Sequence, residues 1–381
     1  MRKQLKVVAD EHIWAVHEAF ASLTGFDVML EVLPTARITA EKVKDADILL
    51  TRTGVQVNAA LLTNSSVRFA ATATIGDDHY DKEWLDKQGV VWATAAGSST
   101  ISVVEYLLAA LFELHQQKKC NLSEMTLGIV GVGRIGGLLA EVCQSLGIRV
   151  LLNDPPRQRA EADLAWVDLE QLLTEADVVT LHTPLIREGE DRTVHLFDEK
   201  HLRMFRGVGI INAARGSCVD HTALLDWLKK DESRWCVMDC WEHEPHISLE
   251  LLDSPACVIA TPHIAGHSLD GKAANTQYVY DALCAYLKIE PTWSMEQALP
   301  ATLMEEGVCV IESWADWQQL ASHLYPMMQD SAALKATAFE AQEARGKQFV
   351  ALRRNYPVRR TWAKQSMPAA QLFEEKTGEK V

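Results

Sequence analysis

Three polar residues in the second half of the sequence could carry acid–base chemistry on a small carboxylic acid. Arg215 stands beside Gly216 after an apolar run, and its planar guanidinium could bind a carboxylate through two donors. His263 also follows an apolar run and could exchange a hydroxyl proton near neutral pH. An acidic neighbour would orient its ring and favour its protonated form. Glu244 and Glu242 are both candidates for this neighbour, and their spacing does not decide between them.

A glycine-rich turn beginning at Gly131 reads Gly-Val-Gly-Arg-Ile-Gly, with an apolar run before it and a helical pattern after it. The glycines Gly131, Gly133 and Gly136 permit a tight turn and close backbone approach, so a pyrophosphate can sit at the helix N-terminus. Eighteen residues after Gly136, Asp154 ends the next expected strand. A carboxylate there would bind the adenosine ribose and repel a 2′-phosphate, which favours NAD over NADP. Arg157 is the alternative, since a nearby arginine can accept a 2′-phosphate.

Strands and helices alternate along most of the chain, which predicts parallel sheets covered on both faces. In the first block we expect strands at 5–9, 28–33, 47–51, 67–73 and 90–93, and helices at 13–23 and 82–87. A long apolar helix follows at 99–115. In the second block we expect strands at 127–130, 149–153, 178–182, 209–212, 235–239 and 257–260, and helices at 133–146, 169–175, 222–229 and 270–287.

The predicted fold class is therefore α/β, with two doubly wound parallel-sheet domains, one Rossmann-like and one flavodoxin-like. We expect a small C-terminal α+β domain after them, because prolines and acidic turns interrupt the alternation of strands and helices after about residue 290. We expect a substrate domain over 1–98 and 267–290, an NAD-binding Rossmann domain over 99–266, and the C-terminal domain over 291–381.

Composition narrows the possible partners and compartment. The 381 residues carry 37 basic and 52 acidic side chains, and the net charge of −15 argues against nucleic acid or an anionic membrane. The start has no apolar signal region, and no run approaches the ~20 apolar residues that a membrane-spanning helix needs. The 8 cysteines include no C-x-x-C pair and no cluster with metal-ligand spacing. We expect a cytoplasmic protein with reduced thiols and no metal.

The order of these motifs, from about residue 7 to 287, resembles the D-isomer-specific 2-hydroxyacid dehydrogenases. The segments that carry the resemblance are the glycine turn with Asp154, Leu-His-Thr-Pro at 181–184, Asn-Ala-Ala-Arg-Gly at 212–216, 239–245, and Thr-Pro-His-Ile-Ala-Gly at 261–266. The resemblance implies NAD-dependent oxidation of a 2-hydroxy acid, with Arg215, Glu244 and His263 in the active site. Because the family places the glutamate before a proline, it favours Glu244 over Glu242.

Segments at 71–76, 103–106, 153–157 and 264–272, with the tail around 352–356, resemble one subgroup of this family. That resemblance implies a phosphorylated 2-hydroxy acid as substrate, 4-phospho-D-erythronate, oxidised to the 2-oxo acid on the way to pyridoxal phosphate. It also implies a homodimer formed through the C-terminal domain. The alternatives are another substrate, such as 3-phosphoglycerate, hydroxypyruvate or glyoxylate, and a non-catalytic NAD-sensing scaffold of the same fold.

The resemblance also assigns binding residues. The substrate contacts are Thr53, Thr74 and His267, where position 267 is tyrosine in many members. A histidine there would offer a phosphate a donor and, once protonated, a positive charge. The cofactor contacts are Gly131, Gly133, Arg134, Ile135, Gly136, Asp154, Thr183, Ala213, Ala214, Arg215, Asp239 and Gly266.

Overall fold

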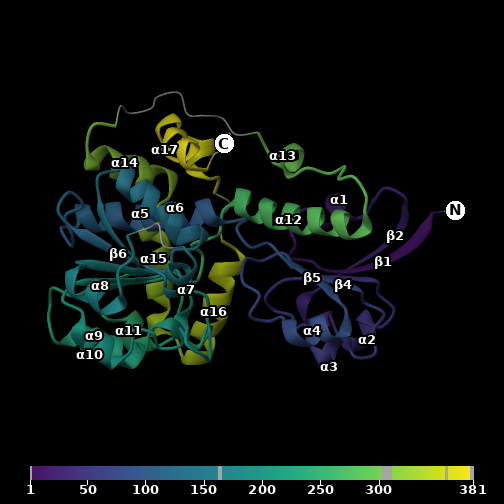
Figure 1. Ribbon diagram of the computed structural model, residues 1–381, viewed down its shortest axis with the longest axis horizontal. Helices are drawn as coiled ribbons and strands as arrows, with labels where there is room; N and C mark the ends of the chain where they lie inside the picture. The colour runs from purple at the N-terminus through teal and green to yellow at the C-terminus, as the bar shows by residue number, and fades with distance from the viewer. Residues whose placement is uncertain (1, 162–164, 302–310, 357–358, 378–381) are drawn as a thin grey trace. The chain divides into compact units, whose positions relative to one another are not determined.

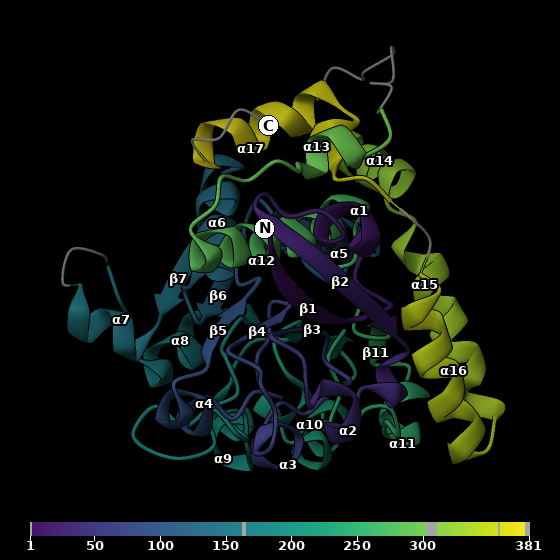
Figure 2. The ribbon, with the colours of Figure 1, turned by 90° about the vertical axis from the view of Figure 1, so that its right-hand side faces the viewer.

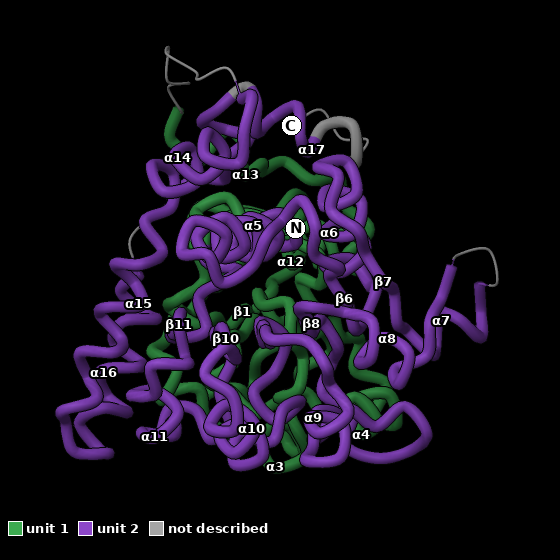
Figure 3. Tube along the Cα trace, turned by 90° about the vertical axis from the view of Figure 1, so that its left-hand side faces the viewer, with its two compact units in different colours: residues 1–99, 268–301 green, residues 100–267, 302–381 purple. Residues whose placement is uncertain are grey.

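Two parallel sheets organise the chain in the computed structural model, which describes residues 2–161, 165–301, 311–356 and 359–377. The chain divides into unit 1, Met1–Ser99 with Ser268–Ala301, and unit 2, Thr100–His267 with Thr302–Val381 (Figure 3). Among the described residues, no helix is both long and apolar enough to cross a bilayer.

The sheet of unit 1 has the strand order β2-β1-β3-β4-β5, and its paired strands are parallel (Figure 1). Its faces are buried by two separate apolar clusters: Val7 and Ala9 of β1 belong to one and Val8 to the other. Burial on both faces explains why the strands read as continuous apolar runs. The strands are β1 (Lys3–Asp10), β2 (Phe26–Leu33), β3 (Ile48–Thr51), β4 (Phe69–Thr72) and β5 (Val91–Thr94). The helices are α1 (Val16–Phe20), α2 (Ala40–Val43), α3 (Ala59–Leu62), α4 (Lys82–Gln88), α12 (Leu269–Leu287) and α13 (Met295–Ala298).

The sheet of unit 2 has the order β11-β10-β9-β8-β6-β7, again parallel. The strand order reverses at β6, which lies between β7 and β8, and ligands collect at such a switch point. The strands are β6 (Thr126–Val130), β7 (Arg149–Asn153), β8 (Val178–Leu181), β9 (Gly209–Asn212), β10 (Trp235–Met238) and β11 (Cys257–Ala260). The helices up to residue 267 are α5 (Thr100–Gln116), α6 (Arg134–Ser145), α7 (Pro155–Ala160), α8 (Leu169–Glu175), α9 (Glu199–Met204), α10 (His221–Lys229) and α11 (Leu249–Leu252).

The C-terminal segment of unit 2 is helical in its described residues, with α14 (Trp314–Leu324), α15 (Met327–Lys335), α16 (Gln342–Arg354) and α17 (Met367–Thr377). It packs on the rest of unit 2: α14 contacts α5, α15 contacts the edge strand β11, and α17 contacts α6 (Figure 2). A separate domain over 291–381 stays a prediction, and its residues 302–310, 357–358 and 378–381 lie outside the described part.

The elements agree closely with the α/β pattern read from the sequence, and each observed strand overlaps an expected one. The main difference is the helix expected at 13–23, which the structure confines to α1. Ala15 adopts a left-handed conformation with φ of 50°, and a helix cannot continue through that geometry. Carboxylate or hydroxyl N-caps mark many of the other starts, at Asp81, Asp154, Asp168, Asp198, Asp220, Ser248, Ser268 and Ser313.

Candidate active site

The glycine turn joins β6 to α6. Two of its glycines have no room for a side chain, whereas the third has free space beside it. Gly131 has φ of 86°, and a Cβ there would lie 2.8 Å from the backbone of His182 and Thr183. A Cβ on Gly136 would lie 2.0 Å from the carbonyl oxygen of Gly131. A Cβ on Gly133 would meet nothing within 4 Å, and no side chain caps α6 at this residue among those described. The open N-terminus of a three-turn helix suits the pyrophosphate of a dinucleotide.

Asp154 lies directly after β7, beside this turn. Its Oδ2 accepts the Val132 N–H (2.8 Å), and its Oδ1 accepts the Arg157 N–H (3.0 Å) at the start of α7. A carboxylate can accept about four hydrogen bonds, so capacity for ribose hydroxyls remains. The Arg157 guanidinium donates to Glu161 and to the Val132 carbonyl. These bonds occupy the side chain that could have accepted a 2′-phosphate, which favours NAD.

Arg215 is held by the turn after β9. The buried Asn212 donates from Nδ2 to the Arg215 carbonyl (3.0 Å), and its Oδ1 accepts the Ala214 N–H (3.1 Å). A Cβ on Gly216 would lie 1.9 Å from the Trp241 carbonyl oxygen, so glycine is required for this close approach. The half-buried guanidinium donates from Nη1 to the Ala214 carbonyl (2.8 Å). Asn212 thus positions Arg215, a role that the sequence analysis did not assign.

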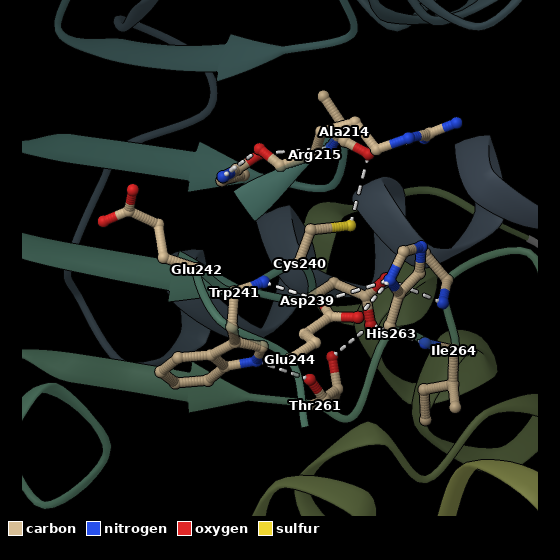
Figure 4. Close-up of polar contacts among 12 residues, drawn as sticks. Ala214, Arg215, Asp239, Cys240, Trp241, Glu242, Glu244, Thr261, His263 and Ile264 are labelled. Carbon is tan, nitrogen blue, oxygen red and sulfur yellow. Dashed lines mark hydrogen bonds and ion pairs between the residues drawn. The ribbon is translucent and has the colours of Figure 1, made fainter. Parts of the chain in front are cut away.

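His263 and Glu244 form a close pair beyond the ends of β10 and β11 (Figure 4). His263 Nδ1 lies 2.9 Å from Oε2 and 3.1 Å from Oε1 of Glu244, and the Trp241 N–H donates to Oε1 (2.8 Å). A carboxylate only accepts, so Nδ1 carries a proton and Nε2 is the atom that can exchange one. Burial of Glu244 acts to raise its pKa, but the charge and hydrogen bonds of His263 outweigh it and lower that pKa from its ordinary value.

Glu242 has a different partner. Its Oε1 lies 2.7 Å from His195 Nε2, and its Oε2 accepts the His221 N–H (3.0 Å). In Figure 4 its carboxylate extends away from His263. The structure therefore pairs Glu244, and not Glu242, with His263, a choice that spacing alone left open.

Asp239, at the end of β10, holds the loop that carries His263. Its Oδ1 accepts the Thr261 hydroxyl (2.7 Å) and the Ile264 N–H (2.8 Å), and its Oδ2 accepts the Ala265 N–H (3.0 Å). The Asp239 carbonyl also accepts the His263 N–H (2.8 Å). The backbone of His263 is left-handed, with φ of 57°. Burial raises the pKa of Asp239, against the opposing charge of His263. The sequence signal for this role was the position of Asp239 directly after one expected strand, with the polar His263 turn directly after the next expected strand.

Cys240 lies between the Arg215 turn and the His263–Glu244 pair. Its Sγ donates to the Ala214 carbonyl (3.3 Å), and burial raises its pKa well above the ordinary value. Its Sγ, a Glu244 oxygen and a His263 nitrogen lie within 4.8 Å of one another, so these residues could hold a metal ion. Sequence spacing gave no sign of this group, because Cys240 and Glu244 come from the segment after β10 and His263 from the turn after β11.

The C-terminal segment also reaches the His263 loop. Arg359 forms a buried ion pair with Glu105 (3.0 Å) and donates to the Ala265 carbonyl (3.3 Å). Both residues belong to unit 2, Glu105 from α5 and Arg359 from the segment before α17. Sequence reasoning missed this contact, although Glu105, an acid among apolar residues in the first half of that helix, was a signal for a buried partner.

The expected substrate contacts are divided between the two units. Thr53 and Thr74 belong to unit 1, just beyond the carboxyl ends of the neighbouring strands β3 and β4. Thr53 is exposed, whereas the buried Thr74 donates to the Gly76 carbonyl (2.9 Å). His267 belongs to unit 2, and its ring lies edge-on to Tyr356 at 6.1 Å between centroids.

The remaining expected cofactor contacts all follow strands of the unit 2 sheet at its carboxyl edge. They are Arg134 and Ile135 at the start of α6, Thr183 after β8, Ala213 and Ala214 after β9, and Gly266 after β11. Strand topology therefore places them along the same edge of the sheet as the glycine turn, and their contact with a cofactor stays a prediction.

Comparison with known proteins identifies the relatives of this chain. Residues 108–265 match the family model described as D-isomer specific 2-hydroxyacid dehydrogenase, NAD binding domain. Erythronate-4-phosphate dehydrogenase from Pseudomonas fluorescens (strain Pf0-1) is 40% identical over 357 residues, covering 93% of this chain and 92% of the relative. The enzyme of the same name from Azotobacter vinelandii is 40% identical over 361 residues, covering 93% of both chains.

Solved structures share the fold at lower identity. D-lactate dehydrogenase from Aquifex aeolicus, complexed with NAD and lactic acid, is 24% identical with a TM-score of 0.61, covering 74% of this chain and 95% of its own. NAD-bound 3-phosphoglycerate dehydrogenase from Entamoeba histolytica is 20% identical with a TM-score of 0.62, covering 75% and 96%. With the geometry of the glycine turn and the His263–Glu244 pair, these findings establish the family: the chain belongs to the D-isomer-specific 2-hydroxyacid dehydrogenases, in the branch of the erythronate-4-phosphate dehydrogenases.

Proposed function

We propose that the protein oxidises 4-phospho-D-erythronate at C2 to (R)-3-hydroxy-2-oxo-4-phosphooxybutanoate, with NAD as hydride acceptor, in pyridoxal 5′-phosphate biosynthesis. The observation that carries this proposal is the 40% identity, over nearly the full length of both chains, to relatives named for that activity. The intact set of Arg215, Glu244 and His263 supports turnover rather than a scaffold that has lost it.

The proposed chemistry uses the atoms of His263 and Arg215 that can still bind the substrate. Nε2 of His263 accepts the C2 hydroxyl proton, and Glu244 stabilises the imidazolium through Nδ1. The Arg215 guanidinium binds the carboxylate of the hydroxy acid and orients C2. Asp239 and Asn212 bind the backbone of the His263 loop and of the Arg215 turn, so they act as positioning residues for His263 and Arg215.

The residues around the glycine turn fit NAD. The space beside Gly133 and the uncapped start of α6 would take the pyrophosphate, and Asp154 would take the adenosine ribose. Bound there, NAD would supply the acceptor for the C2 hydride. Along the same edge of the sheet, the remainder of the dinucleotide site would be lined by Thr183 after β8, Ala213 and Ala214 after β9, and Gly266 after β11.

A substrate panel tests the proposed activity. Phosphorylated and unphosphorylated 2-hydroxy acids are supplied with NAD, and NADH formation is followed by absorbance. We expect the highest kcat/KM with 4-phospho-D-erythronate. A higher value with 3-phosphoglycerate or with a hydroxypyruvate or glyoxylate couple would assign the protein to another reaction of the family. No turnover with any acid, despite NAD binding, would favour a non-catalytic scaffold.

The preference for NAD is tested at Asp154. Replacing it with alanine removes the carboxylate proposed for the ribose and for repulsion of a 2′-phosphate. We expect weaker NAD binding and a smaller ratio of NAD to NADP affinity, measured by fluorescence titration of the reduced cofactors. An unchanged ratio would place Asp154 away from the ribose.

We also propose a cytoplasmic homodimer formed through the C-terminal region. Phe339, between α15 and α16, is 94% exposed, and so large an exposed aromatic side chain fits a protein contact. The unpaired cysteines of the described chain fit a reducing compartment. Sedimentation equilibrium measures the oligomeric state.

A further inference from the structure

The C-terminal segment of unit 2 holds the strand that leads into the His263 loop. This strand, β11, lies at the edge of the unit 2 sheet, so the backbone groups on its outer side need partners from outside the sheet. Helix α15, which contacts β11, supplies them (Figure 2). The hydroxyl oxygen of the buried Ser331 accepts the Ala260 N–H (3.0 Å), and Lys335 donates to the Cys257 carbonyl. Ser331 therefore fixes the last residue of the strand before the loop begins.

Arg359 holds the other end of the His263 loop. Its Nη2 donates to the carbonyls of Ala265 (3.3 Å) and Ser102 (3.4 Å), and its Nη1 binds the Glu105 carboxylate (3.0 Å). The side chain of Arg359 is 8% exposed, and that of Glu105 is fully buried. The planar fork of a guanidinium can serve three acceptors at once, which an ammonium on a single stem does less well. One side chain thus joins α5, the C-terminal segment and the His263 loop.

Arg359 is itself fixed by its surroundings. Its guanidinium lies over the ring of the buried Tyr325, 4.3 Å from the centroid, and Tyr325 directly precedes the segment that begins α15. The Trp362 N–H donates to the same Glu105 carboxylate (2.5 Å). Ser331 and Arg359 therefore belong to one packed segment that reaches both ends of the loop.

The backbone of the His263 loop needs such anchors. The φ of 57° at His263 is a left-handed conformation, which is unfavourable for a residue that carries a side chain. Strained backbone of this kind persists only where the surrounding contacts fix it, and it is frequent at sites of chemistry. Asp239 accepts amides inside the loop. Ser331 and Arg359 add a contact at each end of the loop, from outside the sheet.

We propose that the C-terminal segment positions His263 for proton transfer, with Ser331 and Arg359 as positioning residues. The proposal rests on the proposed function for the role of His263. Both residues act through the backbone of the loop, so their loss misplaces Nε2 of His263 and lowers kcat. The affinity for NAD changes much less, because the glycine turn and Asp154 are expected to hold most of the cofactor. The segment thus acts in catalysis within one chain, in addition to the dimer contact proposed for it.

The first test removes the Arg359 contact without leaving a buried charge unpaired. Arg359→Met is combined with Glu105→Gln, because a lone buried carboxylate would destabilise the fold and glutamine keeps an acceptor for the Trp362 N–H. We expect kcat for 4-phospho-D-erythronate to fall roughly 10- to 100-fold, as when a reacting group is misplaced by about 1 Å. Arg359→Lys keeps the charge and should retain more activity than the double variant. Fluorescence titration should show NADH affinity changed by less than about two-fold.

The second test compares Ser331→Ala with Lys335→Met as a matched control. Both residues join α15 to β11, but Lys335 does so at Cys257, the first residue of the strand, and Ser331 at the end next to the His263 loop. Ser331→Ala should lower kcat several-fold, and Lys335→Met should change it by less than about two-fold. Equal losses of kcat in the two variants would mean that α15 only stabilises the fold, which overturns the proposal.

The His263 ring supplies a readout that a purely structural role would not move. Because Nδ1 of His263 donates to Glu244, we expect the wild-type ring to hold a proton at Nδ1. Ring nitrogen shifts of protein with 15N-labelled histidine report how the proton is shared between Nδ1 and Nε2. In the double variant both nitrogens should share it, whereas the shifts of His195, paired with Glu242, should stay unchanged. His263→Ala and His195→Ala assign the signals.

The two readouts separate this proposal from the proposed function. If the wild type does not oxidise 4-phospho-D-erythronate but the His263 shifts change in the double variant, the proposed function fails and the positioning role stands. If the wild type oxidises it and neither kcat nor the His263 shifts respond to the loss of Arg359 or Ser331, the positioning role fails and the function stands. A lower kcat with unchanged His263 shifts also overturns the positioning role. Melting temperatures show whether each variant is folded, and Ser331→Ala carries both readouts if the double variant is not.

Discussion

Replacing His263 with alanine should lower kcat by roughly 10²–10⁴-fold, the usual contribution of a positioned acid–base group, and leave NAD affinity nearly unchanged. The expected loss is large because Nε2 is the proton acceptor that the Glu244 bond leaves available. Most of the expected cofactor residues, by contrast, follow β6, β7, β8 and β9 and do not depend on the His263 ring. Single-turnover NADH formation and a separate NADH titration measure the two quantities.

His195 supplies a matched control. It also pairs with a glutamate in unit 2, Glu242, at 2.7 Å, but the Glu242 carboxylate extends away from His263 (Figure 4). His195→Ala should therefore lower kcat far less than His263→Ala. Wild-type turnover in His263→Ala, or equal losses in the two variants, would remove His263 from the proposed chemistry.

Replacing Glu244 with glutamine should lower kcat by up to roughly 10⁴-fold, the loss seen when the aspartate that orients a catalytic histidine becomes an amide. Glu244 is ionised across the neutral range, since His263 lowers its pKa. Glutamine removes the charge that stabilises the imidazolium and can present an amide donor to Nδ1.

Glu242→Gln is the corresponding control, two residues away and bonded to His195 and the His221 amide. It should lower kcat far less than Glu244→Gln does. A larger loss of kcat in Glu242→Gln than in Glu244→Gln would reverse the assignment of the two glutamates.

The sequence by itself determined the α/β layers, the glycine turn and the candidates for chemistry. Strands buried on both faces must be apolar throughout, so β3, β6 and β9 are visible as continuous runs. Ligand-binding residues follow the carboxyl ends of such strands, so Asp154, Arg215 and His263 stand at recognisable positions. Periodicity did not show the short helices α2, α3 and α11, because one helical turn is too brief to display it.

Only the tertiary structure decided which of these candidates meet. Two glutamates two residues apart have the same local pattern, and the turn after β10 sends Glu244 to His263 and Glu242 to His195. Contacts between distant segments leave no periodic trace in the chain, as for Arg359 with Glu105. Periodicity reports burial within one element, whereas side-chain pairing depends on how separate elements pack.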